Sequence, residues 1–214
     1  RPFYRGRALQ QLMLPLEAEN IERSDLYVEG YNFIGPMIGS FVQHIADECR
    51  RLGLKKVFFF SREGHTFKKV WERCTPLLFP DKNLPEIEYL YVSRMALAGA
   101  SCAIEGLTKT SVSIALLPQG NKDFTDIARI FQLDLAGLTP HLQRYKLSAT
   151  SCLSPHHEGY DQKYSVRLLE LLEDEAFQDE IKAQVRPASE ALQRYLIDIG
   201  FFDHDQVAVV DIGW

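Results

Sequence analysis

The most constraining feature of this 214-residue chain is the segment Lys56–Phe60, in which a valine and three phenylalanines follow a lysine. A continuous apolar run of β-branched and aromatic residues suits a strand that is covered on both faces. The segment before it, Pro36–Leu52, has apolar residues at helical spacing and is followed by Gly53, a typical helix stop. A helix, a tight turn and a buried strand form half of a βαβ unit, so the pattern predicts an α/β fold.

Apolar spacing predicts one more helix and two more strands in the α/β part of the chain. Thr66–Cys74 has the spacing of a helix, and Glu88–Val92 is a short apolar run that predicts a second strand. In the last segment, Gln206–Trp214, four apolar residues before Asp211 predict a third strand. A buried strand that ends in an aspartate and a glycine normally leads into a helix that covers the sheet. We therefore expect the core to be truncated at its C-terminus.

Residues 108–199 have a different, helical character. Asp123 and Thr125 are candidate N-caps, and Thr139 before Pro140 is typical of a cap followed by a first-turn proline. The last long helical pattern is predicted to break or kink at Pro187. The expected architecture is a Rossmann-like three-layer sandwich with a mainly parallel sheet, formed by residues 1–107 and 200–214, and a helical insertion over 108–199.

Composition excludes several classes of protein. The formal charge of −5 gives no general attraction to nucleic acid. No apolar run approaches the roughly 20 residues that a membrane-spanning helix needs. The cysteines form no C-x-x-C pair, which argues against a zinc site or a disulfide framework and favours a reduced, cytoplasmic protein; they are Cys49, Cys74, Cys102 and Cys152.

Polar residues follow each predicted strand, where the carboxyl ends of parallel strands share one edge of the sheet. Arginine binds phosphate through two hydrogen bonds, serine donates one, and a glycine turn at a helix start exposes N–H groups to an anion. We therefore predict a pocket for a phosphate or carboxylate ligand. Its substrate-binding residues are Ser61, Arg62, Gly64, Ser93, Arg94 and Gly213, and its catalytic residues are Asp211 and Glu63.

The histidines carry a weaker signal. His65, at the start of a helix, is more often a capping or surface residue than a base. His156 and His157 lack the spaced partner set of a metal site and are interpreted as structural or surface residues.

Four stretches, "GYNFIGPMIGSFV", "KKVFFFSREGHTFKKVWE", "EYLYVSRMAL" and "VAVVDIGW", carry a family resemblance. In this order they resemble the region downstream of the haloacid-dehalogenase-type (HAD) domain in bacterial predicted HAD hydrolases that are linked to surface-polysaccharide synthesis. The resemblance implies phosphohydrolase chemistry with Mg²⁺, Asp211 being the nucleophile and metal ligand and Ser61 the strand-end hydroxyl. The sequence departs from the HAD signature at Gly213, where a second aspartate belongs.

Three functional hypotheses result. The first is a domain that binds or acts on a sugar phosphate or nucleotide sugar in surface-glycan synthesis. The second is a non-catalytic module that packs on other domains of a parent chain, such as a HAD or glycosyltransferase domain. The third is a phosphoribosyltransferase-like enzyme, because an acid and a glycine turn after a strand also bind ribose 5-phosphate in that class.

Overall fold

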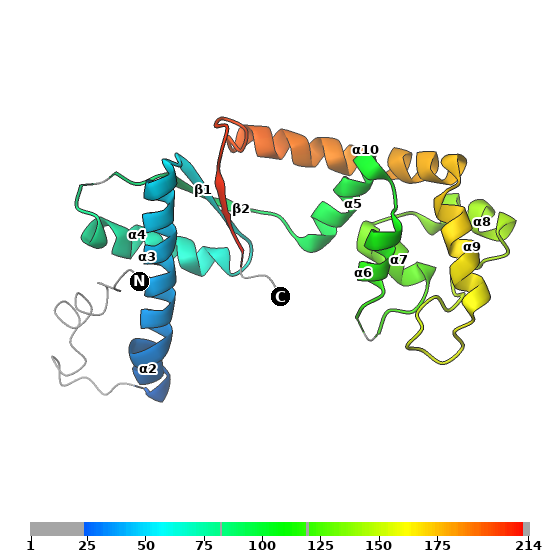
Figure 1. Ribbon diagram of the computed structural model, residues 1–214, viewed down its shortest axis with the longest axis horizontal. Helices are drawn as coiled ribbons and strands as arrows, with labels where there is room; N and C mark the ends of the chain where they lie inside the picture. Colours follow the sequence, from blue (N-terminus) through cyan, green and yellow to red (C-terminus); the bar gives the residue numbers. More distant parts are fainter. Residues whose placement is uncertain (1–23, 82, 119, 212–214) are drawn as a thin grey trace. The chain divides into compact units, whose positions relative to one another are not determined.

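The computed structural model describes residues 24–81, 83–118 and 120–211 and has a mixed α and β fold (Figure 1). The chain divides into two compact units, each with its own hydrophobic core. The α/β unit comprises Arg1–Tyr91 together with Ile199–Trp214, and the helical unit is the continuous segment Val92–Asp198. Residues 92–107 thus belong to the helical unit, whereas the sequence-based division placed them with the α/β core.

Three parallel strands form the sheet of the α/β unit, in the order β2-β1-β3. They are β1 (Lys56–Phe60), β2 (Glu86–Leu90) and β3 (Ala208–Val210). The predicted strand at β1 is confirmed, and the other two predicted strands are present with shifted ends. The glycine turn expected after the third strand lies outside the described residues.

Helices lie before and after β1. The stretch before it consists of α2 (Asp25–Glu29), the π-helical turn η1 (Gly30–Ile34) and α3 (Gly35–Leu52). This stretch ends at Gly53, whose φ of +68° is the left-handed conformation that glycine adopts without steric cost. After the strand, α4 (Gly64–Leu78) joins β1 to β2. Both helices predicted in this unit are therefore present.

The core of the α/β unit lies between one face of the sheet and the helices α3 and α4. Val57 and Phe59 of β1 pack there with Val42 of α3 and Trp71 of α4, all nearly or fully buried. The next side chain along β1, Phe58, is also buried, and its ring lies 4.9 Å from the ring of Phe201. Burial of consecutive residues agrees with the prediction of a strand covered on both faces.

The helical unit has a separate core formed by short amphipathic helices. Most of them begin at a side chain that accepts a backbone N–H, which stabilises a helix start. Asp123, one of the two candidates in the sequence, does so for α7, whereas Thr125 lies within that helix. The helices are α5 (Arg94–Glu105), α6 (Lys109–Ala115), α7 (Phe124–Phe131), α8 (Leu135–Arg144), α9 (Gln162–Leu172) and α10 (Glu175–Asp198).

One expectation about prolines in this unit is wrong, and a second is wrong in part. The helix predicted to begin at Thr139 and Pro140 starts earlier, because Asp134 accepts the N–H of Ala136 and caps α8 there. Helix α10 is not broken at Pro187 but continues through it to Asp198, while the alternative of a kink there stays a prediction. Pro187 is exposed, as is the residue four positions before it, so water can bind the carbonyl that loses its helical partner.

Candidate functional site

The candidate site lies where the strand order of the α/β unit reverses. Helix α4 leads from β1 to β2 on one side, whereas β3 joins β1 on the other side. Phe59 pairs with Val210, so the next residues along these strands, Phe60 and Asp211, come to the carboxyl edge together. In open parallel sheets, ligands bind outside the carboxyl ends of the strands at such a switch point.

The turn after β1 begins beside β2, since the amide of Ser61 donates to the carbonyl of Leu90 at 3.1 Å. Arg62 and Glu63 are exposed, and the amide of Arg62 donates to Glu63 Oε2 at 3.2 Å. The Arg62 guanidinium makes no ion pair within the part of the chain that the structure describes. A charged, accessible guanidinium therefore stands at the sheet edge, where it can bind an anion.

Packing explains Gly64. A Cβ atom at this position would lie 2.7 Å from the carbonyl carbon of Phe59, so only glycine lets α4 approach β1 this closely. The amides of His65 and Thr66 donate to the carbonyls of Arg62 and Glu63, at 3.1 and 3.0 Å. These two helix-start amides are thus occupied, and an anion at this turn would depend mainly on the side chains of Ser61 and Arg62.

Asp211 follows β3 directly and is exposed. It lines a groove of about 240 Å³ between β3 and α3, together with His44 and Glu48 and with apolar residues of α3. Mg²⁺ usually binds one or two carboxylates together with ligand phosphates and water. Asp211 and Glu63 fit that chemistry, although no group of three or more His, Cys, Asp or Glu residues gathers among the described residues.

The other predicted site residues lie elsewhere. Ser93 is the N-cap of α5 and accepts the N–H of Ala96 at 3.2 Å, and Arg94 is the first residue of that helix. Both belong to the helical unit, so their meeting with Ser61 in one pocket stays a prediction. Gly213 lies outside the described residues.

Two tyrosines near this edge were missed by the sequence reasoning, and His65, interpreted there as a capping or surface residue, lies beside one of them. Tyr89 of β2 and Tyr91 just beyond it have ring centroids 4.6 Å apart, and the ring of His65 lies 5.7 Å from that of Tyr89. The tyrosines stand two positions apart in "EYLYV". Period-two spacing puts such residues on one face of a strand, so this signal was available in the sequence.

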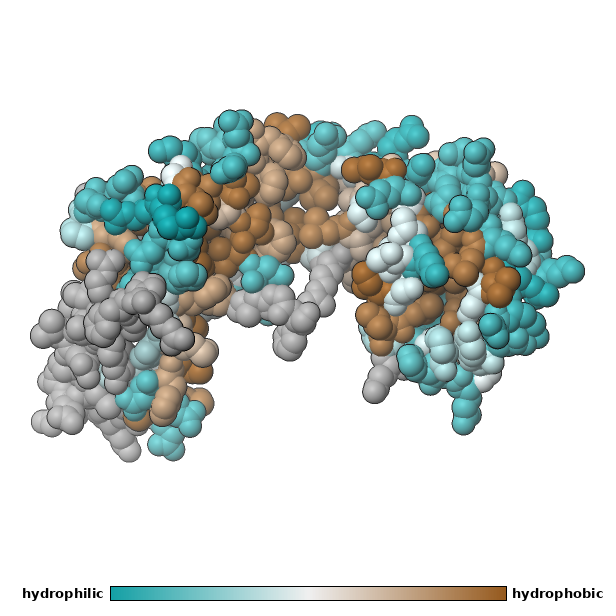
Figure 2. All heavy atoms as spheres, viewed as in Figure 1, coloured by the Kyte–Doolittle hydropathy of each residue, from teal (hydrophilic) through white to brown (hydrophobic). Residues whose placement is uncertain are grey.

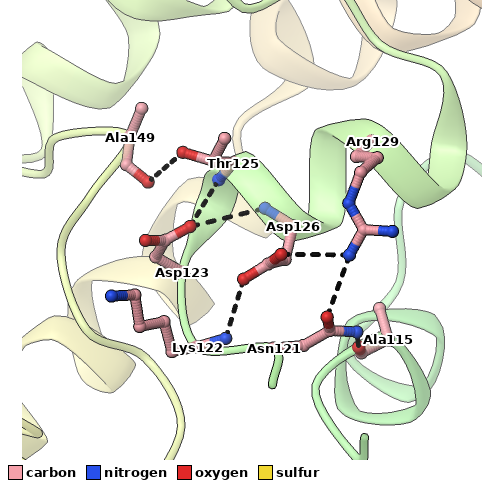
Figure 3. Close-up of polar contacts among 8 residues, drawn as sticks. All are labelled: Ala115, Asn121, Lys122, Asp123, Thr125, Asp126, Arg129 and Ala149. Atoms are coloured by element: carbon pink, nitrogen blue, oxygen red, sulfur yellow. Dashed lines mark hydrogen bonds and ion pairs between the residues drawn. The ribbon is translucent and has the colours of Figure 1, made fainter.

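Polar residues of the helical unit form a network that holds the start of α7 (Figure 3). Asn121 is buried, its Nδ2 donates to the carbonyl of Ala115 at 2.7 Å, and its Oδ1 accepts from Arg129 at 2.9 Å. Burial raises the pKa of Asp126, but hydrogen bonds from the amide of Lys122 and from Arg129 lower it by more. The pKa therefore lies below its ordinary value. These groups satisfy one another, so we assign the network a structural role.

The remaining candidates offer less chemistry. A mainly apolar cavity of about 250 Å³ lies between α6 and α9 and includes His156 on its wall. All four cysteines are free, and burial raises the pKa of Cys49 and of Cys102 to about 11, which keeps both thiols protonated at neutral pH. These two cysteines are therefore packing residues.

Comparison with known proteins gives no further assignment. No family model matches the chain, and no curated protein matches it. Among the helices that the structure describes, none has a stretch long and apolar enough to cross a membrane. The geometry of the sheet edge is therefore the main guide to function.

Proposed function

We propose that the α/β unit is a Rossmann-like domain that binds a phosphorylated sugar or a nucleotide sugar at the carboxyl edge of its sheet. The observation that carries this proposal is the switch point between β1 and β3, at which Ser61, Arg62 and Glu63 follow one strand and Asp211 follows the other. Arg62 would bind phosphate and Ser61 would orient it. Asp211 and Glu63 would hold Mg²⁺ or the hydroxyls of the sugar.

The HAD resemblance supports the same class of ligand. Phosphate transfer or hydrolysis would place the nucleophile at Asp211, with Mg²⁺ neutralising charge on the phosphate. Cytoplasmic sugar phosphates and nucleotide sugars of surface-glycan synthesis are the corresponding substrates.

Binding measurements with the purified chain test the proposal. Calorimetric titration with glucose 1-phosphate and with UDP-glucose, both with Mg²⁺, should give saturable binding. Arg62→Ala should weaken it roughly 10- to 150-fold, the value of a charged hydrogen bond. Arg51→Ala is the matched control, since Arg51 is an exposed arginine of the same unit that pairs with Glu48. Wild-type protein that binds neither compound would contradict the proposal, and equal losses in both variants would remove Arg62 from the site.

A second function, that of a module packing on a catalytic domain, is favoured by an exposed apolar stripe. The stripe runs along α2, η1 and α3, the helical stretch before β1. Figure 2 shows hydrophobic side chains at the surface over this part of the molecule. Large apolar patches on a surface usually mark interaction sites. The stripe consists of Leu26, Phe33, Ile34, Met37 and Phe41. If this function is the main one, Asp211→Asn and Arg62→Ala leave the activity of the complete protein unchanged, while Met37→Glu lowers it.

A further inference from the structure

We propose that the aromatic cluster of His65, Tyr89 and Tyr91 binds a nucleobase, so that the ligand of the sheet edge is a nucleoside diphosphate or its sugar conjugate. This inference rests on the proposed function, because it takes the phosphate site at Ser61 and Arg62 as given. It goes further by choosing between the two ligand classes, a simple sugar phosphate and a nucleotide.

The cluster has a well-exposed tyrosine ring that packs on a half-buried one. Tyr91 is 76% exposed, whereas Tyr89 is half-buried against the core of the α/β unit. The planes of the two rings meet at 87°, and the ring of His65 meets that of Tyr89 at 75°. Tyr89 thus supports the two outer rings edge to face, which is a favourable arrangement for aromatic pairs. A ring held in this way keeps its orientation while much of its surface stays accessible.

The position of the cluster along the sheet edge fits an extended ligand. Since Ser61 donates to Leu90, the end of β2 with Tyr91 lies directly beside the turn that carries Arg62. Asp211 lies on the opposite side of β1, at the end of β3. With neighbouring strands about 4.8 Å apart, the edge presents an aromatic ring, then a cation, then an acid. A nucleoside diphosphate sugar has the matching order of base, phosphates and sugar hydroxyls.

A base suits these rings better than a sugar does. Every nucleobase has a flat π-face that stacks on an aromatic side chain. The ring nitrogens of His65 add a donor and an acceptor for the polar edge of a base. A simple sugar phosphate has no planar ring, and so would use only the phosphate part of this edge.

The test compares a ligand with a base and ligands without one. UDP, inorganic pyrophosphate and glucose 1-phosphate are titrated into the full chain with Mg²⁺ present. UDP should bind roughly 5- to 150-fold more tightly than pyrophosphate, the range that one base–aromatic stack provides. Tyr91→Ala should remove this advantage without weakening pyrophosphate binding, and Tyr91→Phe should keep it. Phe202→Ala, which removes another exposed ring of the same unit, is the control and should change nothing.

The outcomes separate this inference from the proposal on which it rests. If UDP and pyrophosphate bind equally well, or if Tyr91→Ala spares UDP, the base site is refuted and the phosphate site stands. If Tyr91→Ala weakens glucose 1-phosphate as much as UDP, the ring packs on sugar and the nucleobase is again refuted. If no phosphorylated probe binds to the wild-type chain, both proposals fail. Arg62→Ala should weaken UDP and pyrophosphate by the same factor.

Discussion

In the helical unit, polar side chains bind the backbone and one another, as Asn121, Asp123 and Asp126 do around the start of α7 (Figure 3). At the sheet edge of the α/β unit, Arg62 and Glu63 stand exposed after a strand whose three central residues are fully buried. The first set satisfies groups that the fold itself leaves open. The second set makes few contacts that the fold needs, which is why we assign function to it.

The pKa values of two carboxyls in the helical unit show that its polar side chains stabilise the fold. A hydrogen bond from the Tyr145 hydroxyl lowers the pKa of Asp174, with further contributions from the amide of Phe177 and from Arg144. The pKa of Asp126 is lowered by the hydrogen bonds described above. Both carboxylates are therefore more favourable in the folded helical unit than in the unfolded chain, so their charges stabilise the fold.

The largest expected effect is the loss of stability when a buried phenylalanine is removed from one of the two cores. Phe58→Ala should destabilise the α/β unit by about 3–5 kcal/mol, because it removes a fully buried ring from the central strand. Phe177→Ala removes a fully buried ring from the helical core and is the matched change. In a Trp214→Phe background, Trp71 becomes the only tryptophan and reports unfolding of the α/β unit in urea.

Separate cores predict separate responses. Phe58→Ala should move the unfolding transition seen by Trp71 fluorescence to a lower urea concentration. Phe177→Ala should leave that transition nearly unchanged and should instead lower the urea concentration at which the helices of the helical unit unfold, as seen by circular dichroism. Equal shifts of the Trp71 transition in both variants would show that the two units unfold as one.

A smaller effect should separate the two kinds of polar residue. Asn121→Ala should lower the free energy of unfolding by about 1–3 kcal/mol, because it leaves the carbonyl of Ala115 without its buried donor. Arg62→Ala should change it by no more than about 0.5 kcal/mol, as is usual for a surface substitution. Urea titrations of both variants measure the difference. A loss in Arg62→Ala as large as that in Asn121→Ala would assign Arg62 a structural role and weaken the proposed function.

The smallest expected effect is a pH dependence of the helical unit. Because the folded pKa of Asp126 lies below its ordinary value of 3.8, its stabilisation is fully present above that pH. It is lost as the pH falls through the folded pKa. Thermal melts of the wild type and of Asp126→Asn, followed by circular dichroism between pH 6 and pH 2.5, should therefore converge at the acid end. A constant gap across this range would contradict the assignment.

Most elements could be predicted from local pattern. The strand at Lys56–Phe60 and the helix that ends before Gly53 follow from apolar periodicity and a stop residue, which act over a few positions. The start of α8 was misplaced, because Asp134 and the threonine before Pro140 are both plausible caps in sequence. Only the packed helix decides which of two competing caps is used.

Local sequence pattern also predicted part of the candidate site. Ser61, Arg62 and Asp211 could be found because polar residues that follow buried strands stand out in sequence. The sequence did not show whether Tyr91 belongs to the site or to the core, because an aromatic residue at the end of a strand is expected in both. Its exposure and its ring contact with Tyr89 depend on the packing of α4 against β2.

The amino-acid sequence determined where strands and helices form, because propensity, apolar spacing and capping are local properties of the chain. The tertiary structure alone decided the strand order β2-β1-β3 and therefore which strand ends are neighbours. Strand order depends on contacts between residues far apart in the chain, such as Phe59 with Val210, whose pairing no local pattern encodes. Packing also requires glycine at position 64, where the start of α4 meets the backbone of Phe59.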